Sequence, residues 1–122
     1  MEKTKSQIGK SSKARGKRGE LNLVHALRDA GFTEVRRTAQ YCGKAGTSDV
    51  VGIEGLHVEV KNQERLNIWS ALAQSQRDAE ADGNGDIPAV FFKRNRSGWY
   101  VALPLLDFNK LYKGELHHET EK

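Results

Sequence analysis

Two β-rich segments near the middle of the chain, Ser48–Ile53 and Leu56–Lys61, are separated by a short link that contains Gly55. Segments joined in this way predict a β-hairpin. In the second segment apolar and polar residues alternate strictly, and alternate residues of a strand point to opposite faces. The polar face of this strand carries His57, Glu59 and Lys61. The register of the hairpin therefore decides which polar side chains of the first segment can meet them.

The length of the turn sets that register. A two-residue turn sends Asp49 and Glu59 to opposite faces of the sheet. A three-residue turn, Ile53–Gly55, sets Asp49 directly across from Glu59. Such turns place a residue in the left-handed region, to which Gly55 is suited. Only the three-residue turn brings both carboxylates into one site, with their Cβ atoms ~5 Å apart.

Two carboxylates at that distance repel each other unless a cation lies between them. Their oxygen atoms suit Mg²⁺, with Mn²⁺ as a substitute, rather than zinc. Lys61 lies one pleat along the same face, where its ammonium can steady a metal-bound water or the charge on a phosphate. Leu23, Val24, Leu27 and Ala30 form one apolar stripe of a predicted helix. Glu20 shares this stripe, where a carboxylate is costly unless it is paired or binds a metal. Together with Asp49 and Glu59, these residues make a coherent hydrolytic site for phosphodiesters.

Each of these residues also has an ordinary structural interpretation. Glu20 can be an acid in the first turn of its helix, favoured there by the helix dipole. Asp49 can be a turn residue, and a Glu-x-Lys triplet occurs by chance in many chains. His57 shares the face of Glu59, but a strand histidine with ordinary partners is the favoured interpretation.

The rest of the chain predicts a small α/β domain with the order helix, three strands, helix, two strands, helix. We expect helices over 17–30, 68–82 and 105–112, strands over 32–38, 88–93 and 99–103, and a mobile loop over 39–47. Asn67 is the expected cap of the second helix. The nearly all-apolar strand over 88–93 indicates a sheet covered on both faces. Trp69 and Trp99 are expected in the core or between copies of the chain.

Basic charge is concentrated at the N-terminal end. Residues 1–18 carry seven Lys and Arg against one Glu, a net charge of +6, while the whole chain of 122 residues has a net charge of +4. We expect residues 1–16 to form a flexible basic arm, residues 17–112 the folded domain and residues 113–122 a polar tail. Such arms neutralise nucleic-acid phosphates, although a solvated leader is the alternative. The candidate DNA contacts are Lys10, Lys13, Arg15, Lys17, Arg18, Arg36 and Arg37.

Apolar runs and cysteines narrow the class of protein further. No apolar run approaches the ~20 residues of a membrane span, and none follows the basic N-terminus as a secretory signal requires. The single cysteine, Cys42, excludes an internal disulfide framework and a cysteine-cluster zinc site, and it matches no nucleophile pattern. We therefore expect a protein of the reducing cytoplasm with no membrane partner.

The spacing of the candidate site residues resembles the signature of a known superfamily. Asp49, followed after nine residues by Glu59-Val60-Lys61 and preceded by a helical Glu20, is similar to the PD-(D/E)xK nuclease signature. More closely, residues 17–111 resemble the small archaeal-type Holliday junction resolvases and similar phage-encoded proteins.

The resemblance also concerns the residue before Asp49, a glutamine on the second predicted helix, and a serine or threonine near the site. Ser48 stands where the family motif has a proline. Gln74 matches the helical glutamine of these nucleases, with Gln76 as a close rival. In some relatives a serine or threonine before the aspartate contributes to the site, and Thr38, Thr47 and Ser48 are the candidates here.

The resemblance implies an α/β fold with a restriction-endonuclease-like core, in which helices flank a central mixed β-sheet of about five strands. It also implies Mg²⁺-dependent cleavage of branched DNA, most of all four-way junctions, by a homodimer in a prokaryotic or phage-infected cell. The implied catalytic residues are Glu20, Asp49, Glu59, Lys61 and Gln74, with Glu20, Asp49 and Glu59 as metal ligands. A restriction-type or nicking endonuclease with the same core, and a non-catalytic nucleic-acid-binding module, are the alternatives.

Overall fold

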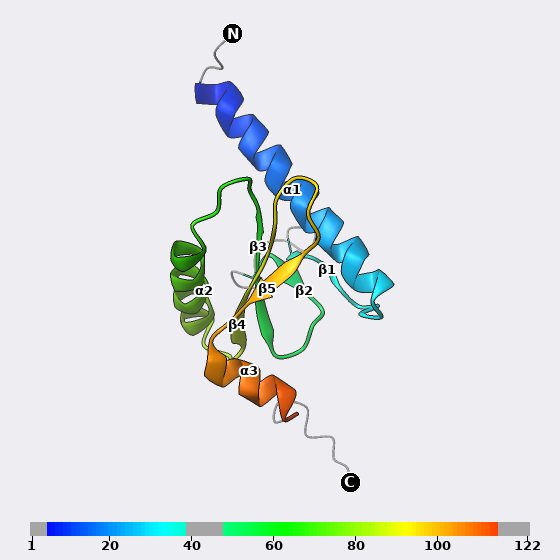
Figure 1. Cartoon of the computed structure of the whole chain (residues 1–122), viewed down its shortest axis with the longest axis vertical. Coiled ribbons are helices and arrows are strands. Elements are labelled where there is room, and N and C mark those ends of the chain that lie inside the picture. The colour runs from blue at the N-terminus through cyan, green and yellow to red at the C-terminus, as the bar shows by residue number, and fades with distance from the viewer. Residues whose placement is uncertain (1–4, 39–47, 115–122) are drawn as a thin grey trace.

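A computed structural model describes residues 5–38 and 48–114, which form one mixed β-sheet with helices beside it (Figure 1). The strands are β1 (Arg36–Arg37), β2 (Val50–Val51), β3 (Leu56–Asn62), β4 (Ile87–Lys93) and β5 (Tyr100–Ala102). The helices are α1 (Lys5–Asp29), α2 (Ile68–Asp82) and α3 (Leu105–Tyr112). The 5-stranded sheet has the order β1-β2-β3-β4-β5, in which only β3 and β4 are parallel neighbours. The α/β class with a central mixed sheet is thus confirmed.

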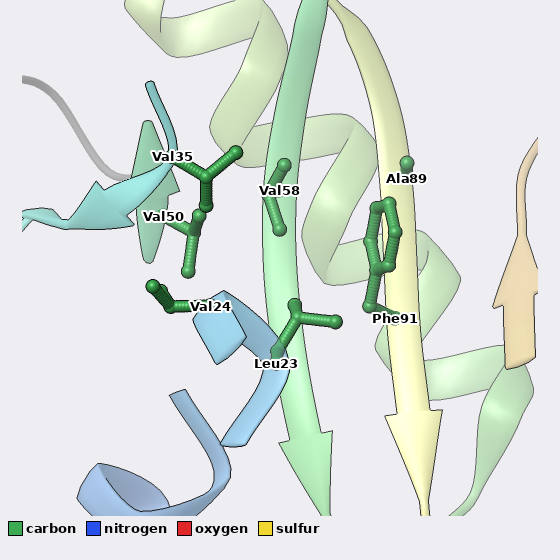
Figure 2. Close-up of a cluster of buried hydrophobic side chains, with 7 residues drawn as sticks. All are labelled: Leu23, Val24, Val35, Val50, Val58, Ala89 and Phe91. Carbon is green, nitrogen blue, oxygen red and sulfur yellow. The ribbon is translucent and has the colours of Figure 1, made fainter. Parts of the chain in front are cut away.

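The main hydrophobic cluster lies between α1 and one face of the sheet (Figure 2). Leu23 and Val24 of α1 lie on the helical stripe expected from the sequence, and both are buried. They pack with valines of the neighbouring strands and with two residues of β4 that point to the same face. The buried members are Leu23, Val24, Val35, Val50, Val58, Ala89 and Phe91.

Helix α2 covers the opposite face and makes the crossover that the parallel pair β3–β4 requires. Asn67 caps it, since its side chain accepts a hydrogen bond from the Ser70 N–H at 3.1 Å, and Gly83 ends it in the left-handed conformation. The buried Val90 alternates along β4 with Ala89 and Phe91, so it points to the face that α2 covers. The predicted helix 68–82 and the sheet covered on both faces are therefore confirmed.

Three elements differ from the sequence prediction. Helix α1 begins at Lys5, so residues 5–16, expected as a flexible arm, are helical. The glycines and serines that suggested a loose arm are tolerated in a helix at a cost of at most about 1 kcal/mol each. Strands β1 and β2 are shorter than expected, because Gly52, with φ +103°, turns the chain away after two paired residues. The predicted loop over 39–47 lies outside the described residues.

Two contacts hold α1 close to the sheet. A Cβ atom at Gly19 would lie 2.7 Å from the Cβ of Asn62 in β3, so only glycine permits this approach. The indole N–H of Trp99 donates to the Asn22 side chain at 2.7 Å, and Trp99 packs against the core as expected. Trp69, in contrast, is 78% exposed on the first turn of α2, so it does not lie in the core, and the alternative position between copies of the chain stays a prediction.

In the part of the chain that the structure describes, no helix is both long and apolar enough to cross a membrane.

Candidate active site

The hairpin β2–β3 has the three-residue turn. Val50 pairs with Val58, which sets Asp49 across from Glu59. The Asp49 N–H donates to the Val58 carbonyl at 2.7 Å, which extends the ladder to the aspartate. Gly55 has φ +87°, the left-handed conformation expected of it. The predicted register is confirmed, and both carboxylates belong to the sheet face that α2 covers.

Burial raises the pKa of both carboxyl groups. The pKa of Asp49 rises to about 6, chiefly through desolvation, although the Val60 N–H donates to its Oδ2 atom at 2.8 Å and opposes the rise. The pKa of Glu59 rises to about 7, through desolvation and then through the negative charge of Asp49. Glu59 is only 5% exposed. Two partly desolvated acids thus repel each other on one sheet face, which is typical of a functional site.

Lys61 and Gln74 complete this arrangement. The Gln74 amide donates to Glu59 Oε2 at 3.4 Å and accepts from Lys61 Nζ at 3.3 Å. The Gln74 side chain of α2 therefore joins the Glu59 carboxylate to the Lys61 amino group. Gln76, the rival in the sequence, is exposed on α2, so the geometry favours Gln74.

Glu20 lies apart from this group. Its carboxylate accepts a hydrogen bond from Arg37 Nε at 2.9 Å, and both side chains are largely buried. Its negative charge still contributes to the raised pKa values of Asp49 and Glu59. Among residues 5–38 and 48–114, no three His, Cys, Asp or Glu side chains are gathered so that they could hold a metal ion. The three-acid cluster that the resemblance implied is therefore not assembled.

Ser48 and Thr38 make structural hydrogen bonds. The Ser48 hydroxyl donates to the Val50 carbonyl at 2.7 Å and accepts from the Val58 N–H at 2.9 Å, so it joins β2 to β3 next to Asp49. Thr38 donates to the Ser48 carbonyl. Both residues are buried, and their hydroxyls support the hairpin that carries Asp49. Thr47 lies outside the described residues, as does Cys42.

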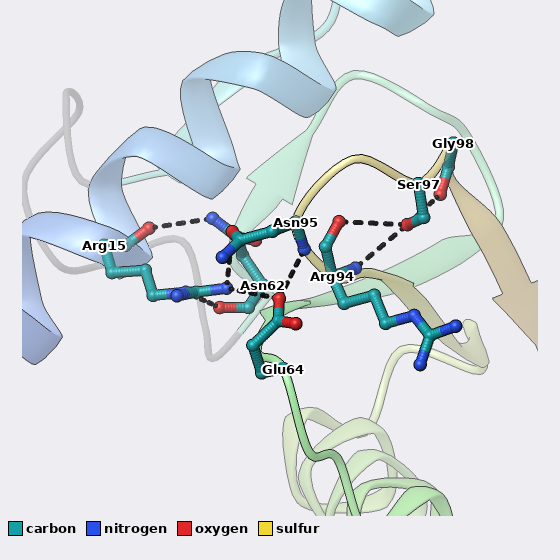
Figure 3. Close-up of polar contacts among 7 residues, drawn as sticks. All are labelled: Arg15, Asn62, Glu64, Arg94, Asn95, Ser97 and Gly98. Carbon is teal, nitrogen blue, oxygen red and sulfur yellow. Dashed lines mark hydrogen bonds and ion pairs between the residues drawn. The ribbon is translucent and has the colours of Figure 1, made fainter.

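Of the candidate DNA contacts, Arg15 and Arg37 are each paired with an acid of the protein itself. Arg15 donates to the Asn62 carbonyl and to Asn95 at 3.2 Å, and it lies 3.7 Å from Glu64 (Figure 3). Arg37 pairs with Glu20 as described above. The sequence did not predict these two ion pairs, because each acidic partner is far away in the chain and no local pattern indicates it. Arg36 donates to the Glu34 carbonyl, Lys13, Lys17 and Arg18 are exposed, and the Lys10 side chain is not described.

His57 has an ordinary partner, as favoured from the sequence. It is 2% exposed on β3, and its Nε2 atom lies 3.4 Å from an Asp82 carboxylate oxygen on α2.

A divalent cation with oxygen ligands fits the pair Asp49–Glu59. Oε1 of Glu59 is buried, and within the described residues it accepts no hydrogen bond. A cation beside this oxygen would supply the missing partner and relieve the repulsion between the two carboxylates. The chemistry of the donors, two carboxylates with no thiol or imidazole between them, matches a hard cation.

Residues 11–121 match the protein family described as "Phage putative PDDEXK endonuclease". The chain belongs to this family. The match spans nearly the whole chain, including Asp49, Glu59 and Lys61, and endonucleases of this class generally use divalent metal ions. No curated protein matches the chain, and no solved structure matches it.

The raised pKa values predict how the stability of the metal-free endonuclease depends on pH. The folded protein holds these protons more tightly than the unfolded chain, whose carboxyls keep values of 3.8 and 4.5. The stabilisation is complete below those values and is lost as the pH rises through about 6 and about 7. We expect Tm in EDTA to fall between about pH 5 and pH 8, and Mg²⁺ to raise Tm at pH 8.

Glu59→Gln should flatten this pH dependence, whereas Glu80→Gln, which changes an exposed acid of α2, should leave it unchanged. Calorimetry across the pH range measures both. An equal slope for Glu59→Gln and the unchanged protein would contradict the assignment.

Proposed function

We propose that this endonuclease cleaves branched DNA, most of all four-way junctions, with Mg²⁺ held by Asp49 and Glu59. The observation that carries the proposal is the register of the hairpin, which sets Asp49 across from Glu59. Lys61 is linked to the same site through Gln74.

The chain's own residues have separate roles in this proposal. When bound, Mg²⁺ acts as a Lewis acid and lowers the pKa of a bound water. Gln74 orients its two neighbours, since it donates to Glu59 and accepts from Lys61. The Lys61 ammonium stabilises the negative charge that builds on the phosphate in the transition state. Glu20 acts from a distance through its charge, and its pairing with Arg37 keeps it there.

A branched substrate and a homodimer belong to the same proposal. The described residues form one sheet and its helices, which leaves few elements to read base sequence. A four-way junction has two-fold symmetry, so cutting two strands calls for two copies of the site. Helix α3 supports a contact between copies, because four of its large apolar side chains are exposed. They are Leu105, Leu106, Phe108 and Tyr112.

The exposed Lys13, Lys17 and Arg18 on α1 are the basic residues proposed to contact phosphates. The reducing cytoplasm of a prokaryotic or phage-infected cell is the proposed place of action.

The test is a comparison of linear duplex, Y-form and four-way junction DNA of the same sequence, each with Mg²⁺, with Mn²⁺ and with EDTA. We expect metal-dependent cutting of the junction in preference to the duplex. Cutting of the duplex at one sequence would instead indicate a restriction-type or nicking enzyme. Binding without cutting in either metal would indicate a non-catalytic module.

Lys61→Ala should lower the rate of cleavage by at least about 100-fold. This is the loss typically seen when an enzyme loses one group that stabilises charge in the transition state. Lys113→Ala, which removes an exposed lysine directly after α3, is the control and should keep most of the activity. Single-turnover cleavage of a junction gives the rates, and circular dichroism checks the fold. Normal cutting by Lys61→Ala would make Lys61 a simple surface charge of the strand.

A further inference from the structure

Two neighbouring pockets lie beside the candidate active site. The smaller, about 180 Å³, is lined by Lys61 and Gln74. Gln63 and Leu66 line it and also the larger pocket, of about 450 Å³. The larger volume falls within the roughly 300–1,000 Å³ of sites that hold small ligands. Any group bound there would therefore lie beside the catalytic lysine.

Two aromatic residues line the larger pocket. Phe92 pairs with Lys61 across the parallel strands and with Tyr100 across β4–β5, so the three residues form a row on one sheet face. The Phe92 and Tyr100 ring centroids are 5.9 Å apart. Tyr100 is nevertheless 61% exposed. A cross-strand aromatic pair stabilises an edge strand, but that role leaves most of the tyrosine ring available to a ligand.

The charge of the larger pocket favours a phosphate-bearing ligand. Lys93 and Arg94 contribute to its lining. Glu64, the acid of the lining, is engaged: its carboxylate lies 3.7 Å from Arg15 and accepts from the Asn95 N–H at 2.6 Å (Figure 3). The negative charge of Glu64 is therefore compensated within the protein. Arg94 is exposed and can meet a phosphate, whereas the Lys93 ammonium lies over the Trp99 ring, 6.0 Å from its centroid.

We propose that this pocket binds a nucleotide of the substrate that is unpaired or has lost a stacking neighbour at the branch point, next to the scissile phosphate, with its base stacked on Tyr100. The inference rests on the proposed nuclease function and deepens it by naming the feature of the DNA that is recognised. A base inside a duplex keeps both faces stacked on its neighbours, whereas an unpaired base can offer one face to an aromatic ring. The pocket would thus select DNA that is open at the point of cleavage.

The experiment is a titration of the full chain in EDTA onto DNA that carries 2-aminopurine, whose fluorescence falls when it stacks. The probe occupies the first unpaired position of a Y-form, the branch point of a four-way junction, or a paired position of a duplex. We expect quenching with the two branched DNAs and none with the duplex. Tyr100→Leu keeps apolar volume beside Phe92 but lacks the ring, so it should abolish the quenching and weaken Y-form binding roughly five- to 100-fold.

Two further variants act as controls. Tyr100→Phe keeps the ring and should keep the quenching. Phe32→Ala removes another exposed aromatic, in the turn that follows α1, and should change nothing. Equal quenching by Tyr100→Leu and the unchanged protein would overturn the inference. So would a Tyr100→Leu variant that alters sedimentation of the free protein while keeping its preference for the Y-form, because β5 would then be a contact between copies.

Cleavage assays on the same DNAs separate this inference from the function on which it rests. Junction cleavage without quenching overturns the nucleotide pocket alone. Quenching without cleavage of any DNA supports the pocket and overturns the nuclease proposal.

Discussion

Asp49→Asn and Glu59→Gln are each expected to reduce DNA cleavage by at least roughly 1,000-fold, beyond the 10–100-fold typical of residues that only support a metal ligand. Each substitution keeps the shape of the side chain and removes the charge that would hold the cation. Junction binding should stay intact or become tighter, because the carboxylates repel the phosphate backbone. Cleavage and gel-shift assays on the same preparations measure the two effects separately.

Glu54→Gln is the matched control for these variants, since Glu54 is an exposed acid in the turn of the same hairpin. It should cut at the normal rate. Normal cutting by either Asp49→Asn or Glu59→Gln would remove the proposed site.

Gly52→Ala is expected to lower the free energy of unfolding by about 3 kcal/mol or more, within the range of the severe single substitutions. Gly52 has φ +103°, and a Cβ atom there would lie 2.2 Å from the Glu34 carbonyl oxygen. The atoms in the way are backbone, so the chain before β1 would have to move. Urea denaturation followed by circular dichroism measures the loss.

Gly31→Ala isolates the contribution of the close contact. Gly31 has a similar φ of +110° but nothing within 4 Å of the added atom. It should lose only the roughly 1–2 kcal/mol that a left-handed backbone costs other residues. Equal losses for the two variants would show that φ alone matters and that the approach of Gly52 to Glu34 does not.

Local patterns were sufficient for much of the fold and for part of the site. The alternation of β3 and the position of Gly55 predicted the register that joins Asp49 to Glu59. A cap at each end predicted α2, and apolar spacing predicted the buried stripe of α1. These signals are contained in a few neighbouring residues, so they can be recognised before any tertiary contact is known.

Contacts between distant parts of the chain could not be predicted in this way. Arg15 and Arg37 looked like DNA contacts because of their charge, yet each has an acidic partner within the protein, 49 and 17 residues away in the chain. The exposure of Trp69 depends on how α2 is rotated against the sheet, which its size alone does not reveal. The start of α1 was missed because glycine and serine disfavour a helix only weakly.

Because α1 is one long continuous helix, its N-terminal half is a rigid projection rather than a flexible arm. Twenty-five residues in helical conformation span about 38 Å, and only the later part of α1 packs on the sheet (Figure 1). Arg15 joins the helix to the end of β3 and to the turn before β5, which fixes its direction (Figure 3). A ligand that binds the N-terminal half of α1 is therefore held at a fixed distance and direction from Asp49 and Glu59. The phosphate contacts proposed on α1 therefore need no further ordering of this helix when DNA binds, because its conformational entropy is already lost when the protein folds.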